Sequence, residues 1–413
     1  MRQNRLDRQI RIEGWNQRAL ENANVGIVGD DDLLASMYIL AASALGINKL
    51  LVLAPVLNAM LIETARKLNP RFYLMHIKGY YVHPLLNDLF KECRLIVDLS
   101  RYALANKLIL EKGYSENIPI IRGLCYEDHD SQGFNIFTYI RGREWQGLEH
   151  ILAPRNLPNG HFDDGVLDSI IAGIVLEETK NVLMGQDVSD DLITYKRKKP
   201  AQQNGQNQIL VVGSGALGSL VGIGLVYSGF RNITFMDPDI VDVTNLNRQV
   251  FFYDAIGKSK SKALSKKFNS LFGVDSRAIV ACFDRETNIS TFDVIFDCVD
   301  NFESRIVLSE KCHDLNKILI SGGTSADAAQ VVTYHPATSD VTPAELLGLY
   351  DIVENREPDA DRRQRVGCTD QVDPSVIMTN QIAAGFMVDS YRMLLDGQHP
   401  KNVFYNSNCN TKF

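Results

Sequence analysis

The stretch QILVVGSGALGSL, residues 208–220, decides the fold of this chain. It opens on a short apolar run, residues 209–212, which predicts a buried parallel strand. An apolar segment of helical length, residues 220–227, follows a G-x-G-x-x-G pattern formed by Gly213, Gly215 and Gly218. Glycines at these places allow a tight turn, close approach of the backbone to a phosphate, and close packing of helix on strand. The stretch therefore predicts a Rossmann-like nucleotide site at a helix N-terminus.

Side chains downstream of the glycines indicate which nucleotide the site holds. A second apolar strand, residues 233–236, ends on Asp237, about 20 residues past the glycines, where such folds bind a ribose hydroxyl. NAD-dependent dehydrogenases share these features, but they have no use for Arg248 and Lys260 beside another carboxylate, Asp300. Cleavage of ATP between its α and β phosphates needs such cations, and it needs an acidic residue to hold magnesium. The sequence therefore predicts an ATP site.

Three spaced motifs carry a family resemblance. They are D-x-D-x-V-x-x-x-N-L-x-R-Q at residues 237–249, G-x-x-K at 257–260 and C-x-D-N at 298–301. Together they resemble the ThiF/MoeB/ubiquitin-activating-enzyme superfamily, whose members adenylate the C-terminal glycine of a ubiquitin-like protein. The close resemblance covers residues 208–397.

The resemblance implies a role for each matching residue. Asp237 would bind the ribose of ATP and Asp300 would hold Mg²⁺. The other residues at motif positions are Asn245, Arg248, Gln249 and the phosphate-binding Lys260. Arg8, in the segment RLDRQ, matches an arginine that reaches into the partner subunit's ATP site and stabilises charge on the triphosphate. Taken alone, the segment indicates the polar start of a helix, and a surface arginine is the alternative.

The first half repeats this organisation with its chemistry removed. Residues 25–29, VGIVG, again lead a strand into a turn, but Asp30, Asp31 and Asp32 follow, and carboxylates repel a polyphosphate. Leu53 takes the place of the ribose aspartate, and Arg101 that of the magnesium aspartate. We therefore expect an α/β fold with two tandem Rossmann-like ThiF-type adenylation domains packed as a pseudo-dimer. Residues 1–187 would form the inactive domain and residues 208–413 the active one.

The composition changes between the two halves. Residues 196–199 are basic, and residues 200–207 are mostly polar. We interpret residues 188–207 as an exposed linker. Binding of a nucleic acid or an acidic partner by the basic run is the alternative. A fused, asymmetric chain of this kind needs no second copy to place Arg8 in the ATP site.

The candidate nucleophile lies near the end of the chain. Residues 336–367 have an irregular pattern, and the family has a crossover segment here that guides the partner's tail towards ATP. Cys368 follows it, near arginines at 362, 363 and 365 and shortly before an apolar helix expected at residues 376–393. Cations and a helix N-terminus both favour the reactive thiolate. By its family position Cys368 would form a thioester, and Cys409 in the polar tail is the alternative.

Composition excludes several function classes. The chain is 45% hydrophobic and 23% charged, typical of a globular protein, and its net charge of −7 argues against a nucleic-acid partner. Neither a run of about 18 apolar residues nor a signal-peptide core is present, so we expect no membrane association and a cytoplasmic location. Seven cysteines without a C-x-x-C pair indicate free thiols, and we expect no zinc. Core positions are expected for Cys282, Cys298 and Cys312.

These features predict an enzyme resembling bacterial ubiquitin-activating-like enzymes with a fused inactive and active half. The C-terminal glycine of a ubiquitin-like partner would attack the α-phosphate of ATP, and pyrophosphate would leave. Cys368 would then hold the partner as a thioester for transfer to a conjugating enzyme. The alternative is an enzyme of the same fold that adenylates a sulfur-carrier protein or a peptide without a lasting thioester.

Overall fold

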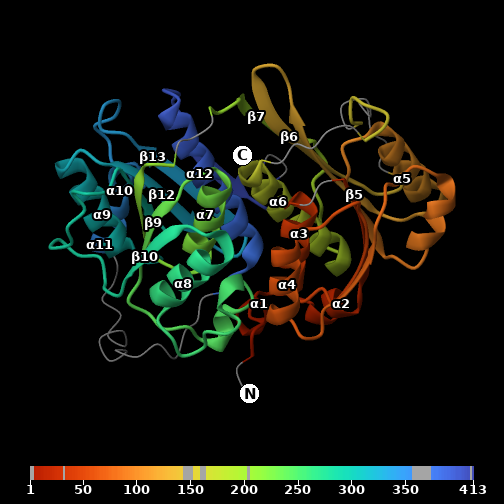
Figure 1. The fold of residues 1–413 in the computed structure, drawn as a ribbon, viewed down its shortest axis with the longest axis horizontal. Coiled ribbons are helices and arrows are strands. Elements are labelled where there is room, and N and C mark those ends of the chain that lie inside the picture. The colour runs from red at the N-terminus through yellow and green to blue at the C-terminus, as the bar shows by residue number, and fades with distance from the viewer. Residues whose placement is uncertain are drawn as a thin grey trace.

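The framework consists of two sheets with the same strand order (Figure 1). The computed structural model describes residues 4–30, 33–142, 152–158, 164–201, 205–355, 374–409 and 412–413. Within them each half of the chain forms one seven-stranded sheet. In both sheets the first five strands are parallel and the last two antiparallel. The shared topology confirms the predicted α/β fold and the duplication.

The first sheet has the order β3-β2-β1-β4-β5-β6-β7. Its strands are β1 (Asn24–Gly29), β2 (Lys49–Leu53), β3 (Tyr73–Ile77), β4 (Leu95–Leu99), β5 (Ile120–Glu127), β6 (Ser131–Tyr139) and β7 (Ile193–Lys198). The second has the order β10-β9-β8-β11-β12-β13-β14. Its strands are β8 (Gln208–Val212), β9 (Asn232–Met236), β10 (Asp275–Ile279), β11 (Val294–Asp297), β12 (Ile318–Thr324), β13 (Ala328–Tyr334) and β14 (Val403–Asn406).

Helices connect the parallel strands and cover the sheets. Those of the first half are α1 (Asp7–Ile10), α2 (Gln17–Asn22), α3 (Leu33–Leu45), α4 (Ala59–Leu68), the 3₁₀ helix η1 (Pro84–Phe90), α5 (Ala103–Glu116) and α6 (Gly165–Met184). Those of the second half are α7 (Ala216–Tyr227), η3 (Val243–Asn245), η4 (Val250–Phe252), α8 (Lys260–Phe272), α9 (Phe302–Asp314), α10 (Pro343–Leu346), α11 (Leu349–Glu354) and α12 (Ile377–Leu395). The short helices α10 and α11 lie in the predicted crossover segment, whose residues 356–367 are outside the described part of the chain.

The two halves meet through their most apolar helices. Figure 1 shows α6 and α12 near the middle of the molecule, and α3 and α7 pack against them. A Cβ on Gly173 would lie 2.7 Å from Ile382 Cγ1, and a Cβ on Gly385 would overlap Ile170. The two glycines therefore let α6 and α12 approach each other closely. The apolar core is continuous across this contact, so the halves pack as a pseudo-dimer.

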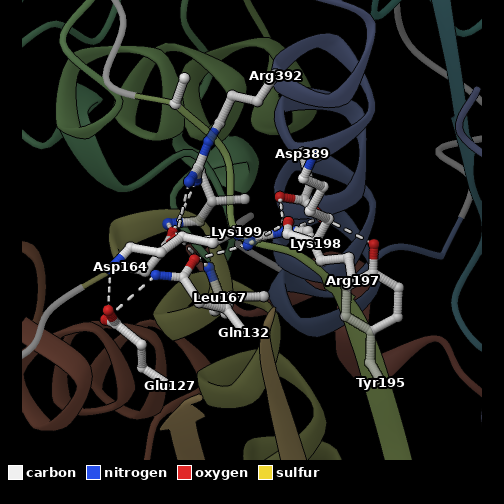
Figure 2. A network of polar contacts seen from close by, with 12 residues as sticks. Glu127, Gln132, Asp164, Leu167, Tyr195, Arg197, Lys198, Lys199, Asp389 and Arg392 are labelled. Atoms are coloured by element: carbon white, nitrogen blue, oxygen red, sulfur yellow. Dashed lines mark hydrogen bonds and ion pairs between the residues drawn. The ribbon is translucent and has the colours of Figure 1, made fainter. Parts of the chain in front are cut away.

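Polar contacts also cross between the halves, and they correct the prediction of a linker at 188–207. Residues 193–198 form β7, an edge strand of the first sheet, which therefore extends past the expected boundary at 187. Arg197 on β7 is buried because two carboxylates neutralise it: Nη2 lies 3.0 Å from Asp164, and Nε lies 2.6 Å from Asp389 on α12. Arg392 of α12 makes two further bonds to Asp164, at 2.8 and 2.9 Å (Figure 2). The basic run thus includes a buried contact of the interface.

The strand register corrects one correspondence between the halves. Val28 of β1 pairs with Leu53, and Val212 of β8 pairs with Met236. Leu53 therefore corresponds to Met236, and the residue at the place of Asp237 is Ala54. The backbone N–H groups of Ala54 and Asp237 donate to equivalent strands, to Ile77 O and Ile279 O. The first half therefore still lacks a carboxylate at the ribose position, but the residue at that position is Ala54 instead of Leu53.

Candidate functional site

The glycine turn lies between β8 and α7. Gly213 has a φ of +93°, in the left-handed region that glycine adopts without strain. A Cβ on Gly218 would overlap the carbonyl oxygen of Gly213, so glycine is required for the helix to start this close to the strand. Because α7 begins at Ala216 with no side-chain cap, the N–H groups of its first turn are available to an anion.

Asp237 lies at the end of β9, beside this turn. Its buried carboxylate accepts hydrogen bonds from Ser214 N at 2.7 Å and Asp239 N at 2.8 Å. Burial raises the pKa of Asp237 above its usual value, although the charge of Lys260 opposes the shift. Lys260, at the start of α8, places its Nζ 2.8 Å from Asp239 Oδ2. The predicted ribose and phosphate residues therefore lie at one edge of the sheet.

The N-L-x-R-Q segment, residues 245–249, begins at the last residue of the 3₁₀ helix η3, which is fixed by its own side chains. Asn245 completes a capping box with Asp242, accepting from Asp242 N at 2.9 Å. Arg248 is buried and donates to Thr244 O at 3.2 Å and Asn247 Oδ1 at 2.8 Å. Burial and the nearby charge of Arg8 lower the pKa of Arg248 to about 9, while Asp300 opposes the shift. A bound anion would relieve this repulsion between two cations.

Gln249 also faces the glycine turn. A Cβ on Gly215 would lie 3.5 Å from Gln249 Nε2. The Oε1 atom of Gln249 is buried without a hydrogen-bond partner among the described residues. A buried amide oxygen without a partner is costly, so this side chain is suited to a ligand that donates a hydrogen bond.

Arg8 reaches the site from the other half of the chain. Its helix, α1, is held next to η3 because Gln9 donates to Leu45 O at 2.8 Å and accepts from Asn247 Nδ2 at 3.3 Å. The charge of Arg8 also lowers the pKa of Asp242. The first half thus places a cation at the cavity of the second half.

Asp300 follows β11, and its side chain is exposed at the same edge of the sheet. The next residue, Asn301, is the N-cap of α9 and accepts from Ser304 N at 2.8 Å. Arg305 lies one turn further along α9. It is buried, and its Nη2 donates to Val299 O at 2.7 Å and Gly322 O at 2.6 Å, because the first turn of α9 packs against the ends of β11 and β12.

These side chains line one cavity of about 890 Å³. The sequence-predicted residues that it brings together are Arg8, Gly213, Gly215, Asp237, Asn245, Arg248, Gln249, Lys260 and Asp300. Gly218 lies behind the turn. Sequence reasoning missed several other lining residues, Arg305, Gln330, Ser375, Asn380 and Phe404. The glycine pair at residues 322–323 was the available signal, because it marks a place where backbone and side chains approach closely.

The corresponding edge of the first half is closed by its own side chains. Asp30 stands one residue after Gly29, where Ser214 follows Gly213, and it accepts from Arg101 N at 2.9 Å. Arg101 Nε lies 3.5 Å from the same carboxylate. Burial raises the pKa of Asp30, and the charge of Arg101 opposes the shift. An internal ion pair therefore lies where the second half has a cavity, while Asp31 and Asp32 are outside the described residues.

The cysteines differ in their access to the cavity. Cys368 and its neighbouring arginines lie outside the described residues. Cys409 is exposed, three residues after Asn406, which lines the cavity. Cys312 is buried as expected, and Cys298 is half-buried. Cys282 is exposed, contrary to the expected core position, because it follows the end of β10 at the rim of the cavity.

The lining has the chemistry of a site for a magnesium-bound nucleoside triphosphate. Backbone N–H groups and three cations, Arg8, Arg248 and Lys260, offer charge to phosphates. Mg²⁺ is commonly held by one or two carboxylates together with substrate phosphates, and Asp300 is a carboxylate of this kind. In the described part of the chain, no group of three or more His, Cys, Asp or Glu side chains could hold a metal ion by itself.

The fold and this cavity define a Rossmann-like α/β protein with its site at the carboxyl edge of a parallel sheet, where the strand order reverses between β8 and β11. The chain belongs to the ThiF family, whose model matches residues 190–412, more than half of its length.

Named relatives match a shorter part of the chain. A probable molybdopterin-synthase adenylyltransferase of Porphyra purpurea is 36% identical over 138 residues, which are 32% of this chain and 35% of the relative. The molybdopterin-synthase adenylyltransferase of Haemophilus influenzae is 34% identical over 32% of this chain and 57% of its own length. An adenylyltransferase and sulfurtransferase MOCS3-1 of Zea mays is 33% identical over 32% of this chain and 29% of the relative. The chain thus spans well under two thirds of these relatives.

Among solved structures, E. coli MccB with ATP aligns at a TM-score of 0.40 and 18% identity, over 50% of this chain and 62% of that one. Within the residues that the structure describes, no helix is both long enough and apolar enough to cross a membrane.

Proposed function

We propose that this chain uses ATP to adenylate the terminal carboxylate of a small carrier protein or peptide. The observation that carries the proposal is the single cavity in which the glycine turn, Asp237, Arg248, Lys260 and Asp300 meet Arg8 of the other half. A site for a dehydrogenase cofactor would need no such set of cations. Membership of the ThiF family and the adenylyltransferase names of the relatives support the same reaction.

In the proposed reaction a carboxylate oxygen of the carrier attacks the α-phosphorus of ATP, and the bond to the β-phosphate oxygen breaks to release pyrophosphate. The carboxylate is already a nucleophile, so no general base is needed. Asp237 binds the ribose, while Arg248, Lys260 and Arg8 stabilise the charge on the phosphates. Bound Mg²⁺, held by Asp300, would supply further charge neutralisation on the phosphate oxygens.

The proposed product is the acyl-adenylate. The relatives' names refer to adenylyl transfer, and the name of the Zea mays protein also refers to sulfur transfer. They therefore support adenylation of a carrier for sulfur incorporation, part of the alternative stated above, better than transfer to a conjugating enzyme. A ubiquitin-like carrier ending in glycine, a thioester on Cys368 or Cys409, and a cytoplasmic location remain predictions.

Exchange of labelled pyrophosphate into ATP tests the proposal. The protein is incubated with Mg²⁺-ATP and a panel of ubiquitin-fold proteins ending in glycine, and carrier-dependent exchange is expected. Asp300→Ala should abolish exchange, whereas Asp314→Ala, an exposed carboxylate at the end of α9, should not. Exchange that persists in Asp300→Ala would contradict the assigned role. An adduct that thiols cleave, lost in Cys368→Ala or Cys409→Ala, would establish a thioester instead of a free adenylate.

A further inference from the structure

Beyond Asp300 the cavity continues along the edge of the sheet towards β12, β13 and β14. The lining residues there include Arg305, Gly323, Gln330 and Asn380. None of these belongs to the motifs that predicted the nucleotide site. Because β12 neighbours β11 in the sheet, this part of the cavity adjoins the place where Asp300 would meet the phosphates.

Arg305 is a buried cation in an unusual position. It lies in the first turn of α9, where the helix dipole disfavours positive charge. Its charge acts on Asp297, opposing the rise that burial causes in the pKa of that carboxyl. Yet no carboxylate oxygen lies within 4.0 Å of the guanidinium in the described part of the chain. Its Nη2 is held by the two carbonyl oxygens of Val299 and Gly322. A buried cation without an ion pair has an energetic need for an anionic or strongly polar ligand.

Gly323 has no side chain that would crowd this guanidinium. A Cβ on Gly323 would lie 3.2 Å from Arg305 Nη1 and 3.0 Å from Gln330 Nε2. Two hydrogen-bond donors from different elements, α9 and β13, therefore converge on one point at the wall of the cavity. Neither Nη1 of Arg305 nor the amide of Gln330 has a hydrogen-bond partner among the described residues, so both donors are available to a ligand.

We propose that Arg305 Nη1 and the Gln330 amide bind the acyl oxygen of the substrate. They would first bind the terminal carboxylate of the carrier and then the carbonyl of the acyl-adenylate, with Gly323 leaving the space. This assignment rests on the proposed function, because it identifies the acyl end of the same cavity. An arginine can donate to the carboxylate of the carrier and to the carbonyl of the acyl-adenylate. It would increase the affinity for the acyl group without contacting the nucleotide.

A pair of nucleoside analogues tests the assignment without knowledge of the carrier. One is 5′-O-[N-(acetylglycyl)sulfamoyl]adenosine, a stable stand-in for a glycyl adenylate. The other is 5′-O-sulfamoyladenosine, which lacks the acyl group. Calorimetric titration gives both dissociation constants for the wild type and for Gly323→Ala, Gln330→Ala and Arg305→Lys. The matched control is Arg285→Met, whose exposed guanidinium pairs with Glu310 of α9.

The wild type and Arg285→Met should bind the acylated analogue more tightly than the unacylated one. This preference should fall about tenfold in Gly323→Ala and Arg305→Lys, which disturb a hydrogen bond from a charged donor, and about threefold in Gln330→Ala, which removes a neutral donor. Affinity for 5′-O-sulfamoyladenosine should be unchanged in all three variants. An unaltered preference in both Gly323→Ala and Gln330→Ala would overturn the assignment, even if Arg305→Lys failed to fold. Failure of the wild type to bind either analogue would instead overturn the proposed function and the assignment with it.

Discussion

Arg197 Nε donates to both carboxylate oxygens of Asp389, at 2.6 and 2.8 Å, and the two residues belong to different halves of the chain. Both side chains are 1% exposed. Tyr195 of β7 adds a third bond to the same carboxylate, at 2.8 Å. The contact therefore joins the edge strand β7 to α12, the helix whose first turns line the cavity.

Removal of one partner of this pair should destabilise the protein strongly. Arg197→Met leaves Asp164 and Asp389 buried with fewer cations, and breaking a buried pair typically costs about 3–5 kcal/mol of unfolding free energy. Urea denaturation measures the change. Lys198→Met, at the exposed neighbouring position, is the control and should cost less than about 0.5 kcal/mol. Equal stability of the two variants would contradict the assigned importance of the interface.

The phosphates of ATP should compete with Asp239 for the ammonium group of Lys260. Loss of a charged hydrogen bond in Lys260→Met should weaken ATP binding by about tenfold or more. Asp239 is 55% exposed, so its pair with Lys260 is worth about 0.2–1 kcal/mol. Asp239→Asn should therefore tighten ATP binding by up to about fivefold. Calorimetric titration with Mg²⁺-ATP checks both values, and weaker binding in Asp239→Asn would mean that the carboxylate holds the lysine in its working position.

As the pH is lowered, nucleoside binding should weaken at a higher pH than the usual pKa of an aspartate would predict. Asp237, the proposed ribose acceptor, loses its charge when its carboxyl takes up a proton, and burial raises the pKa of this group. Affinity for 5′-O-sulfamoyladenosine, which has no titrating phosphate, should fall with an apparent pKa above about 3.9. By linkage, this carboxyl contributes stability at acid pH that is lost as the pH rises through its native pKa. Asp237→Asn should remove the pH dependence, and a wild-type profile that is flat down to pH 4 would contradict the prediction.

Arg8→Ala should slow adenylation without unfolding the chain. Removal of one donor from a preorganised charge-stabilising site typically lowers the rate constant by about 10²–10³. Pyrophosphate exchange at saturating ATP measures this effect, and thermal denaturation should show little change. Arg11→Ala is the matched control, because Arg11 follows the same helix and pairs with Asp7 at the surface. If both variants exchange at the wild-type rate, Arg8 is only a surface residue.

The sequence predicted the features that depend on local backbone geometry. Gly213 and Gly218 are required by a turn and a close approach that no other residue accommodates, so their spacing indicated the strand, the helix and the site together. The duplication was visible for the same reason, since both halves use the same order of strands. The one-residue error at Ala54 arose because an apolar run does not define where a strand ends.

Long-range partners explain what the sequence did not predict. Arg197 and Arg305 lie in segments that look polar and exposed. Each is buried only because acceptor groups distant in the sequence bind its guanidinium. Asp389, which neutralises Arg197, comes 192 residues later, and Gly322, which accepts from Arg305, comes 17 residues later. The opposite error occurred at Cys282, where an apolar neighbourhood suggested burial although the strand had already ended.

The placement of Arg8 in the cavity of the second half has a consequence for enzyme kinetics. Since both sides of the site belong to one polypeptide, dilution does not separate them. Specific activity should therefore stay constant from micromolar to nanomolar enzyme, unlike that of an enzyme whose site is completed by a dissociable second subunit. Each molecule would also turn over a single nucleotide at a time, because the ion pair of Asp30 and Arg101 occupies the corresponding edge of the first half.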